Sequence, residues 1–226
     1  VNIVHDFSRH PGDYWPTKLF LKNFIKSGHS IITLSSYVQK KIPSNIKSSL
    51  ASFPAPHFTS EFSQKEKTID LLIIGRFKKY KNLKSLKILA NNNLNYKIVI
   101  AGSGKIPRSL SNNNSIRILN KWLSEKEIFD LILTSRAILL PYSEASQSGW
   151  ISLALSLGTP VISTNVGGLR EQFENREDGL IFETINDLIA FLNDREQFCN
   201  FLRYVRPRFR QYNPKISELI LEERRK

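Results

Sequence analysis

The chain has 226 residues, of which 41% are hydrophobic, and a formal net charge of +13 at pH 7. This length suffices for one large domain or one and a half ordinary ones, and 41% apolar residues can form a sizeable core. No apolar run is long enough to span a membrane, and no segment reads as a signal peptide. The single cysteine, Cys199, cannot form an internal disulfide, so we expect a cytoplasmic protein.

The positive charge favours an anionic partner. The basic residues are spread along the chain, without a DNA- or RNA-binding motif and without interleaved aromatic residues. We therefore expect phosphate binding and a weak peripheral attraction to the anionic inner face of a membrane. A nucleic-acid-binding module is the weaker interpretation.

The first block of the chain alternates strands and helices. Its predicted elements are a strand at Val1–Val4, a helix at 17–28, a strand at 30–34 and a short helix capped by Ser35 and Ser36. A natural domain seldom begins in mid-strand, so we expect that an upstream part is missing. The alternative is an unusual start codon. Residues 43–69 have little periodicity and read as a hinge or linker.

A second block repeats the alternation over a longer stretch. Apolar and β-branched runs predict strands at 68–74, 96–101, 115–119, 137–140 and 161–164. Helices are expected at 82–91, after the capping-box pair Ser124 and Glu127, and after Gly149. This order predicts an α/β fold, a Rossmann-like doubly wound parallel sheet, plus a partial second α/β domain. The tail reads as two helices broken at Pro207 and Pro214.

Two basic side chains follow the strand at 68–74. Gly75 permits a tight turn there, and Arg76 and Lys81 could hold a diphosphate from two sides. The alternative is a solvated helix start. Because a helix N-terminus disfavours so much positive charge, we expect a bound anion.

Small residues follow two other strands. Gly102 and Gly104 flank a turn that is structural by itself and gains interest only if it shares an edge with Arg76. The loop Ser146–Gly149 precedes an apolar helix, where backbone amides can bind phosphate or a serine can act only as an N-cap. The segment alone leaves both interpretations open.

One N-terminal loop contains His5, Asp6 and His10. A histidine beside an aspartate is either a hydrogen-bonded loop contact or a sugar contact or base. No residue spacing suggests a metal site, and no nucleophile elbow or Walker-type loop is present.

Four motifs follow one another between residues 68 and 183. They are GRFKKYKNL, KIVIAGSG, PYSEASQSGWISLALSLGTPVISTNVGGLRE and DGLIFE. Together they resemble the donor-binding half of a GT-B glycosyltransferase of family 4, whose members move a sugar from a nucleotide sugar to an acceptor, with retention and generally without a metal. HDFSRHPGD and HSIITLSSYVQKKI resemble, less securely, the end of that family's acceptor-side domain.

The resemblance implies donor-binding and catalytic residues. Arg76 and Lys81 would hold the donor diphosphate and stabilise the leaving group. His5 or His10 would face the sugar from the other domain. The further implied positions are Gly102 and Gly104, Lys121 and Trp122 near the nucleotide base, Ser146, Gln147, Ser148 and Gly149 near the phosphates or sugar, and Gly167, Gly168 and Glu171 in the second loop.

One departure from the family pattern concerns its paired glutamates. Many members carry two, separated by seven residues, and the matching positions here are Ala145 and Leu153. Leu153 removes the usual ribose contact. Glu144 is one place from the first position and is a catalytic candidate that cannot be equated with the missing glutamate.

The resemblance also divides the chain into three parts. Residues 1–55 would be an acceptor-side remnant with the hinge, 56–190 the nucleotide-sugar-binding domain, and 191–226 helices that cross back to the N-terminal part. We expect a retaining glycosyltransferase that builds cell-surface polysaccharide, such as lipopolysaccharide, on a glycan or lipid-linked acceptor. The alternative is a truncated, non-catalytic remnant that binds the nucleotide sugar.

Overall fold

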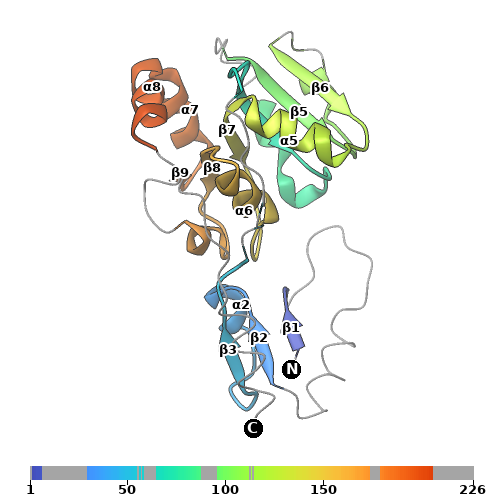
Figure 1. Cartoon of the computed structure of the whole chain (residues 1–226), viewed down its shortest axis with the longest axis vertical. Coiled ribbons are helices and arrows are strands. Elements are labelled where there is room, and N and C mark those ends of the chain that lie inside the picture. Colours follow the sequence, from blue (N-terminus) through green and yellow to red (C-terminus); the bar gives the residue numbers. More distant parts are fainter. Residues whose placement is uncertain are drawn as a thin grey trace.

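The structure, a computed structural model, contains two parallel β-sheets that lie one below the other in Figure 1. Within the part of the chain that the structure describes, the smaller sheet has three strands in the order β1-β2-β3, and the larger has six in the order β6-β5-β4-β7-β8-β9. The residues that the structure describes are 2–6, 30–54, 56, 58, 65–87, 96–111, 113, 115–173 and 179–205.

The large sheet is doubly wound, as predicted. The chain starts at β4 in the middle, moves outward through β5 to β6, returns to β7 on the other side of β4, and continues to β8 and β9. Every neighbouring pair is parallel. The strands are β4 (Ile69–Ile74), β5 (Ile98–Gly102), β6 (Ile116–Asn120), β7 (Ser135–Leu140), β8 (Val161–Thr164) and β9 (Gly179–Phe182). All five strands predicted for this part are present, and β9 is an additional edge strand.

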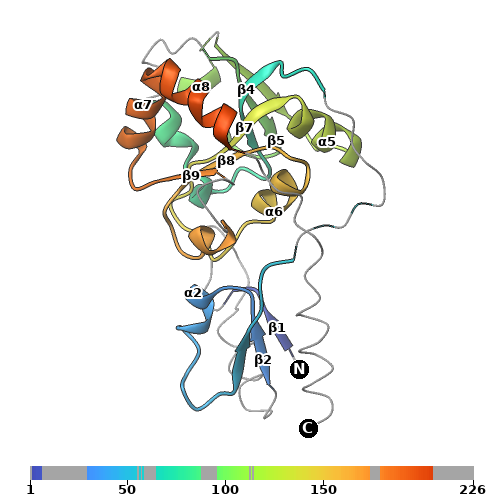
Figure 2. The ribbon, with the colours of Figure 1, turned by 60° about the vertical axis from the view of Figure 1, so that its left-hand side comes forward.

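Helices cover both faces of the large sheet, because successive side chains of a strand point to opposite faces. In β4, Leu71 and Ile73 join one buried core cluster, whereas Leu72 and Ile74 join the other. Helices α7 and α8 pack in the first cluster and α5 and α6 in the second, on opposite sides of the sheet (Figure 2). The helices are α4 (Arg108–Ser111), α5 (Glu125–Leu133), α6 (Gly149–Ser156), α7 (Ile185–Asn193) and α8 (Arg195–Tyr204), with 3-10 turns η1 (Lys79–Lys81), η2 (Leu83–Ser85) and η3 (Leu169–Gln172).

The small sheet takes its third strand from the segment predicted to be a linker. The buried β2 (Ile31–Thr33) pairs in parallel with β1 (Asn2–Val4) and with β3 (Ser48–Leu50). The sequence of β3, Ser-Ser-Leu, has no alternating apolar pattern, so periodicity did not reveal it. Helix α2 (Ser36–Gln39) begins after the N-cap Ser35, as predicted.

The predicted helix at 82–91 starts differently from expectation. It begins with the 3-10 turn η2, preceded by Asn82, whose φ of +50° is left-handed. Asparagine tolerates this conformation, which interrupts a regular helix. The argument from charge at a helix N-terminus therefore does not apply to Lys81. Residues 88–95 lie outside the described part.

Two C-terminal helices, α7 and α8, lie before the predicted breaks at Pro207 and Pro214. Asp194 lies between α7 and α8, and its carboxylate accepts a hydrogen bond from the Gln197 amide at 2.8 Å, which caps α8. The domain boundary predicted after residue 190 falls inside α7. Pro207 and Pro214 lie outside the described residues, so the crossing of the tail to the N-terminal part stays a prediction.

Candidate functional site

A cavity of about 530 Å³ opens at the carboxyl ends of β4, β5, β6 and β7, beside the loop that follows β1. The strand order reverses between β4 and β7, and a ligand crevice is expected at such a switch point. Nine residues of the predicted site line this cavity: His5, Arg76, Lys81, Gly102, Lys121, Trp122, Gln147, Ser148 and Gly149.

Lys81 is buried in the wall of the cavity, with only 3% of its surface exposed. Its Nζ donates to the hydroxyl of Tyr142 and lies 3.5 Å from the carbonyl oxygen of Ile74. Burial, and then the nearby Arg76 guanidinium, lower the pKa of Lys81 to about 7. No carboxylate pairs with this ammonium among the described residues, so an anion in the cavity would stabilise its charged form.

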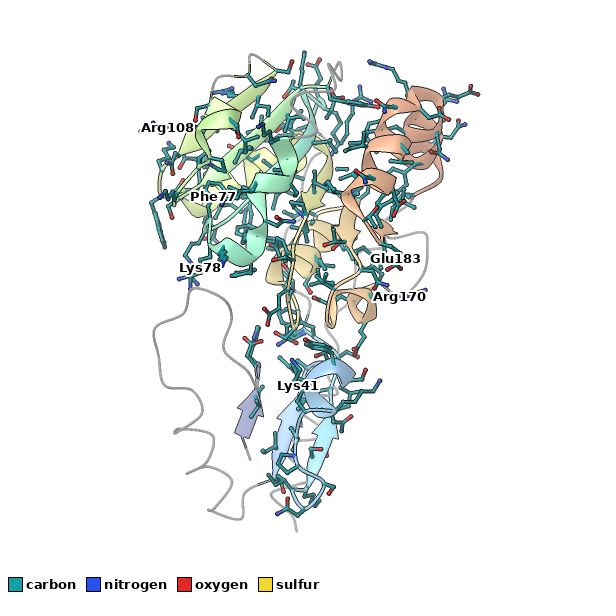
Figure 3. All side chains as sticks on the ribbon, turned by 180° about the vertical axis from the view of Figure 1, so that it is seen from behind. Lys41, Phe77, Lys78, Arg108, Arg170 and Glu183 are labelled. Carbon is teal, nitrogen blue, oxygen red and sulfur yellow. The ribbon has the colours of Figure 1, made fainter. Side chains whose placement is uncertain are left out.

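Other cations surround Lys81. Arg76 is exposed, follows β4 directly after Gly75 and lines the same cavity. Lys78 also lines it and extends from the edge of the large domain nearest the small sheet (Figure 3). Asp6 is the one acidic residue among the described residues that line the cavity. The cavity is therefore suited to a ligand with more than one negative charge.

Gly75 and Gly102 allow two strand ends to approach closely. Both have left-handed φ values, 121° and 137°. A Cβ at Gly102 would lie 2.1 Å from the Gly75 carbonyl oxygen, and one at Gly75 would lie 2.7 Å from Nε1 of Trp150. Neither position accepts a side chain, so the backbone itself forms this part of the cavity wall.

The loop after β7 contributes side chains to the cavity wall, and one of its backbone amides already donates a hydrogen bond within the protein. Ser148 is the N-cap of α6, and its N–H donates to Oε1 of Gln172 at 2.6 Å. Gln172 in turn donates from Nε2 to the Ser148 carbonyl at 3.0 Å. The Ser148 amide is thus not available to a phosphate in this structure, contrary to the implied role, although Ser148 lines the cavity.

The loop after β1 meets the loop after β7. His5 Nδ1 lies 2.9 Å from a carboxylate oxygen of Asp6, and the other Asp6 oxygen accepts from the hydroxyl of Ser146. Gln147 Nε2 donates to the His5 carbonyl at 2.9 Å. These bonds join the loop after β1 to the loop after β7 at the cavity, and the sugar-facing role of His5 stays a prediction. The other candidate, His10, lies outside the described residues.

Lys121 and Trp122 follow β6 at the far end of the cavity. Trp122 is 79% exposed, which leaves its ring free to stack on a planar group. Lys121 Nζ forms an ion pair with Glu127 at 2.5 Å, and this hydrogen bond, with those from Ser124, lowers the pKa of Glu127 to about 2. Glu127 also completes the predicted capping box of α5.

Several predicted site residues do not line the cavity. Gly104 has φ +137°, and a Cβ there would lie 2.8 Å from the Phe77 carbonyl, so it serves the backbone bridge to Phe77. Glu144, the carboxylate catalytic candidate, is also outside the lining, as is Ser146, which bonds Asp6.

The second loop forms a contact between the two sheets. Glu171 accepts hydrogen bonds from the backbone and hydroxyl of Ser36 at 2.5 and 2.8 Å and from the Tyr37 amide at 3.0 Å. A Cβ at Gly167 would lie 1.6 Å from a backbone oxygen, and one at Gly168 would lie 2.8 Å from the Cβ of Ser35. Glu171 thus contacts α2, whereas Gly167 and Gly168 lie closest to the backbone of the loop after β7. The implied role of these three residues in donor binding stays a prediction.

The sequence reading missed Tyr142, Trp150 and Gln172. Tyr142 is buried, receives the Lys81 hydrogen bond and bonds the Ser148 side chain; its pKa is raised by burial. Its place in a Pro-Tyr turn directly after an apolar strand was the available signal. Gln172 lies on the next loop, and no local pattern predicts its bonds to Ser148.

Comparisons with known proteins identify the family of this chain. A model of the family "Glycosyl transferases group 1" matches residues 57–197, more than half of the chain. The chain belongs to this family. A search of curated proteins found no match.

Solved GT-B glycosyltransferases share the fold of this group 1 chain. TarM is 12% identical in sequence and has a TM-score of 0.70. The similarity covers 98% of this chain and 49% of the TarM chain. Anabaena Alr3699/HepE in complex with UDP and glucose is 13% identical, TM-score 0.68, covering 97% and 70%. The lipopolysaccharide outer core galactosyltransferase WaaB is 20% identical, TM-score 0.55, covering 78% and 57%. The chain thus spans about half the length of TarM.

Proposed function

We propose that this chain binds a nucleotide sugar in the cavity and transfers the sugar to a glycan or lipid-linked acceptor in cell-surface polysaccharide synthesis. The observation that supports it most strongly is the pair Arg76 and Lys81 at the switch point of the large sheet. Arg76 is exposed, and Lys81 is buried without a carboxylate partner among the described residues. A diphosphate would satisfy both.

The same two cations suit the chemistry of sugar transfer. When the bond between the sugar and the diphosphate breaks, negative charge develops on the departing phosphate. Lys81 is fixed in the buried wall of the cavity, and a positive group held in place in this way stabilises that charge without reorganising. In this proposal Arg76 and Lys81 neutralise the charge of the departing diphosphate, without a resident metal. The sugar keeps its anomeric configuration.

The relatives' names support the ligand class. HepE is described in complex with UDP and glucose, and WaaB as a lipopolysaccharide galactosyltransferase. We propose that this chain likewise uses a nucleotide-sugar donor and a cell-surface acceptor. None of the described helices is long and apolar enough to cross a bilayer. With a net charge of +13, we propose peripheral contact with the anionic inner face of the membrane, from the cytoplasm.

The test is a thermal-shift panel on the 226-residue chain with UDP, GDP, UDP-glucose, UDP-galactose and GDP-mannose. A ligand that binds only the folded state raises the melting temperature. We expect one nucleotide family to do so at concentrations where orthophosphate does not. If no member exceeds orthophosphate, the proposal is wrong.

A second candidate function is that of a truncated protein that binds the nucleotide sugar but does not transfer the sugar. It is favoured by Ala145 and Leu153, which stand at the positions where many family members carry glutamate. An assay for nucleoside diphosphate released from the bound donor, with and without acceptor glycans, separates the two. Binding without release favours the remnant, and acceptor-dependent release favours the enzyme.

A further inference from the structure

Charge is distributed unevenly between the two halves of the large domain. Residues 71–124, from β4 to the loop after β6, contain eleven lysines and arginines and no aspartate or glutamate. Residues 125–205, from α5 to α8, contain six basic and twelve acidic residues. The first segment thus has a net charge of +11 and the second a net charge of −6. Such an asymmetry indicates that one side of the molecule meets an anionic surface.

Five cations of the first segment form a basic face outside the cavity. The basic face consists of Lys79, Lys84, Lys87, Lys105 and Arg108. All five are exposed, and none lines the cavity. Among the described residues, none of the five forms an ion pair with a carboxylate. Their charge is therefore not neutralised within the described part of the chain and is available to a partner.

Backbone contacts hold two segments of the basic face together. Phe77 and Gly104 form a parallel bridge, and the N–H of Phe77 donates to the carbonyl of Ser103 at 2.7 Å. The chain after β4 therefore lies beside the chain after β5. Lys79 follows the bridge on the first of these segments, and Lys105 follows it on the second.

The other cations of the basic face belong to one layer of the domain. Leu83 of η2 and the neighbouring Leu86 are buried in the same core cluster as Leu110 of α4. Because these apolar side chains enter one core, the exposed cations beside them lie on the outer surface of one face of the large sheet. Arg108 of α4 is labelled on this side of the domain in Figure 3.

The basic face borders the cavity. The 3-10 turn η1 contains both Lys79, which belongs to the basic face, and Lys81, which lines the cavity. Lys78, directly before this turn, also lines the cavity. A surface that contacts the basic face therefore lies close to the cavity.

The form of these elements favours a membrane surface over a nucleic acid. The turns η1 and η2 have three residues each and α4 has four, which is too short for a recognition helix in a DNA groove. Binding of a single strand relies on aromatic rings, and the exposed ring among the described residues, Trp122, lines the cavity instead. An anionic bilayer requires only several cations on one side of the protein.

We propose, resting on the membrane contact and the lipid-linked acceptor proposed above, that the basic face binds the headgroups of anionic lipids. This contact holds the cavity beside the bilayer in which such an acceptor is anchored. The acidic segment 125–205 is repelled by the same surface, so one orientation of the protein is favoured.

The experiment measures co-sedimentation of the 226-residue chain with vesicles of phosphatidylcholine alone and of phosphatidylcholine mixed with phosphatidylglycerol. The first variant combines Lys84→Gln, Lys87→Gln and Arg108→Gln, which removes three charges of the basic face. Lys79→Gln combined with Lys105→Gln is the second variant should the first not fold.

The matched control removes the same number of charges from the acidic segment. It combines Lys126→Gln, Arg170→Gln and Arg203→Gln, three exposed cations that do not line the cavity. The first variant and the control therefore have the same net charge and differ only in where the charges are lost. UDP or GDP affinity of each variant shows whether the cavity is intact.

We expect the first variant to bind the anionic vesicles at least about tenfold more weakly than wild type, and the control less than about twofold more weakly. Binding of wild type should weaken as salt rises, and nucleotide affinity should stay within about twofold in both variants. No binding of wild type to anionic vesicles, equal losses in the two variants, or tighter binding of wild type to an oligonucleotide than to the vesicles would overturn the inference alone. If wild type binds the vesicles as expected but no member of the nucleotide panel, the proposed transfer fails and the membrane contact stands.

Discussion

Lys81 is the residue whose chemistry the fold alters most. A lysine side chain that is 3% exposed has lost most of its hydration, and Arg76 adds a like charge nearby. Its pKa of about 7 means that the empty cavity holds a partly neutral amine at physiological pH. A diphosphate reverses this, because a negative charge beside the amine favours the ammonium.

This linkage predicts a pH dependence of binding. The free-state pKa of Lys81 is lowered to about 7, and the bound state raises it, so binding takes up a proton at pH 8. UDP or GDP affinity should therefore fall as pH rises from 7 to 9, by up to about tenfold per pH unit. Calorimetry at pH 8 in buffers of different ionisation enthalpy measures the proton uptake. Lys81→Met should abolish it, and an unchanged uptake in that variant would exclude Lys81 as its source.

The glycine at the end of β5 supports a second residue-scale prediction. At Gly102 a Cβ would lie 2.1 Å from the Gly75 carbonyl oxygen and φ is +137°, so Gly102→Ala should lower the free energy of unfolding by about 2 kcal/mol or more. Gly149, where a Cβ meets nothing within 4 Å, is the control, and Gly149→Ala should change stability by less than about 1 kcal/mol. Urea denaturation of both variants measures the difference. Equal effects would show that the close approach of β4 and β5 is not required.

At the scale of elements, apolar runs predicted the central strands β4 and β5 because these strands are buried on both faces. Ser124 and Glu127 predicted the start of α5 for an equally local reason. The strand β3 could not be predicted, because its Ser-Ser-Leu sequence is placed by backbone pairing with β2. Likewise, the boundary between α7 and α8 was not predicted, because it is set by the Asp194 cap and not by a proline.

The contact between η3 and α2 gives a prediction at this scale. Glu171→Ala removes three hydrogen bonds to Ser36 and Tyr37, so amide exchange in α2 should accelerate about tenfold. Hydrogen-exchange mass spectrometry of residues 36–39 measures it, with peptides of α5 as the internal reference. Glu183→Ala, which removes a bond to Asn165 within the large domain, is the control variant. Unchanged exchange in α2 would mean that Glu171 does not hold the two sheets together.

At the scale of the whole molecule, the site depends on contacts that no local pattern contains. The parallel sheet brings Arg76, Gly102 and Trp122 to one edge, so sequence order and strand direction predicted that part of the cavity. The bonds of His5 to Gln147 join residues 142 positions apart, and the role of Glu171 could be read only from the packing of the small sheet. The structure shows Glu171 in contact with α2, and the donor-binding role that the resemblance implies for it stays a prediction.

The central claim is that Arg76 and Lys81 form a diphosphate site at the switch point. The most direct test uses whichever of UDP and GDP binds the wild-type chain more tightly, and measures its affinity for three variants. Arg76→Gln and Lys81→Met each remove a cation that lines the cavity. Lys79→Gln removes an exposed charge nearby that does not line it. By calorimetry at pH 7, we predict a loss of affinity of at least about tenfold for the first two and less than about twofold for the third. Equal losses in all three, or no loss in the first two, would contradict it.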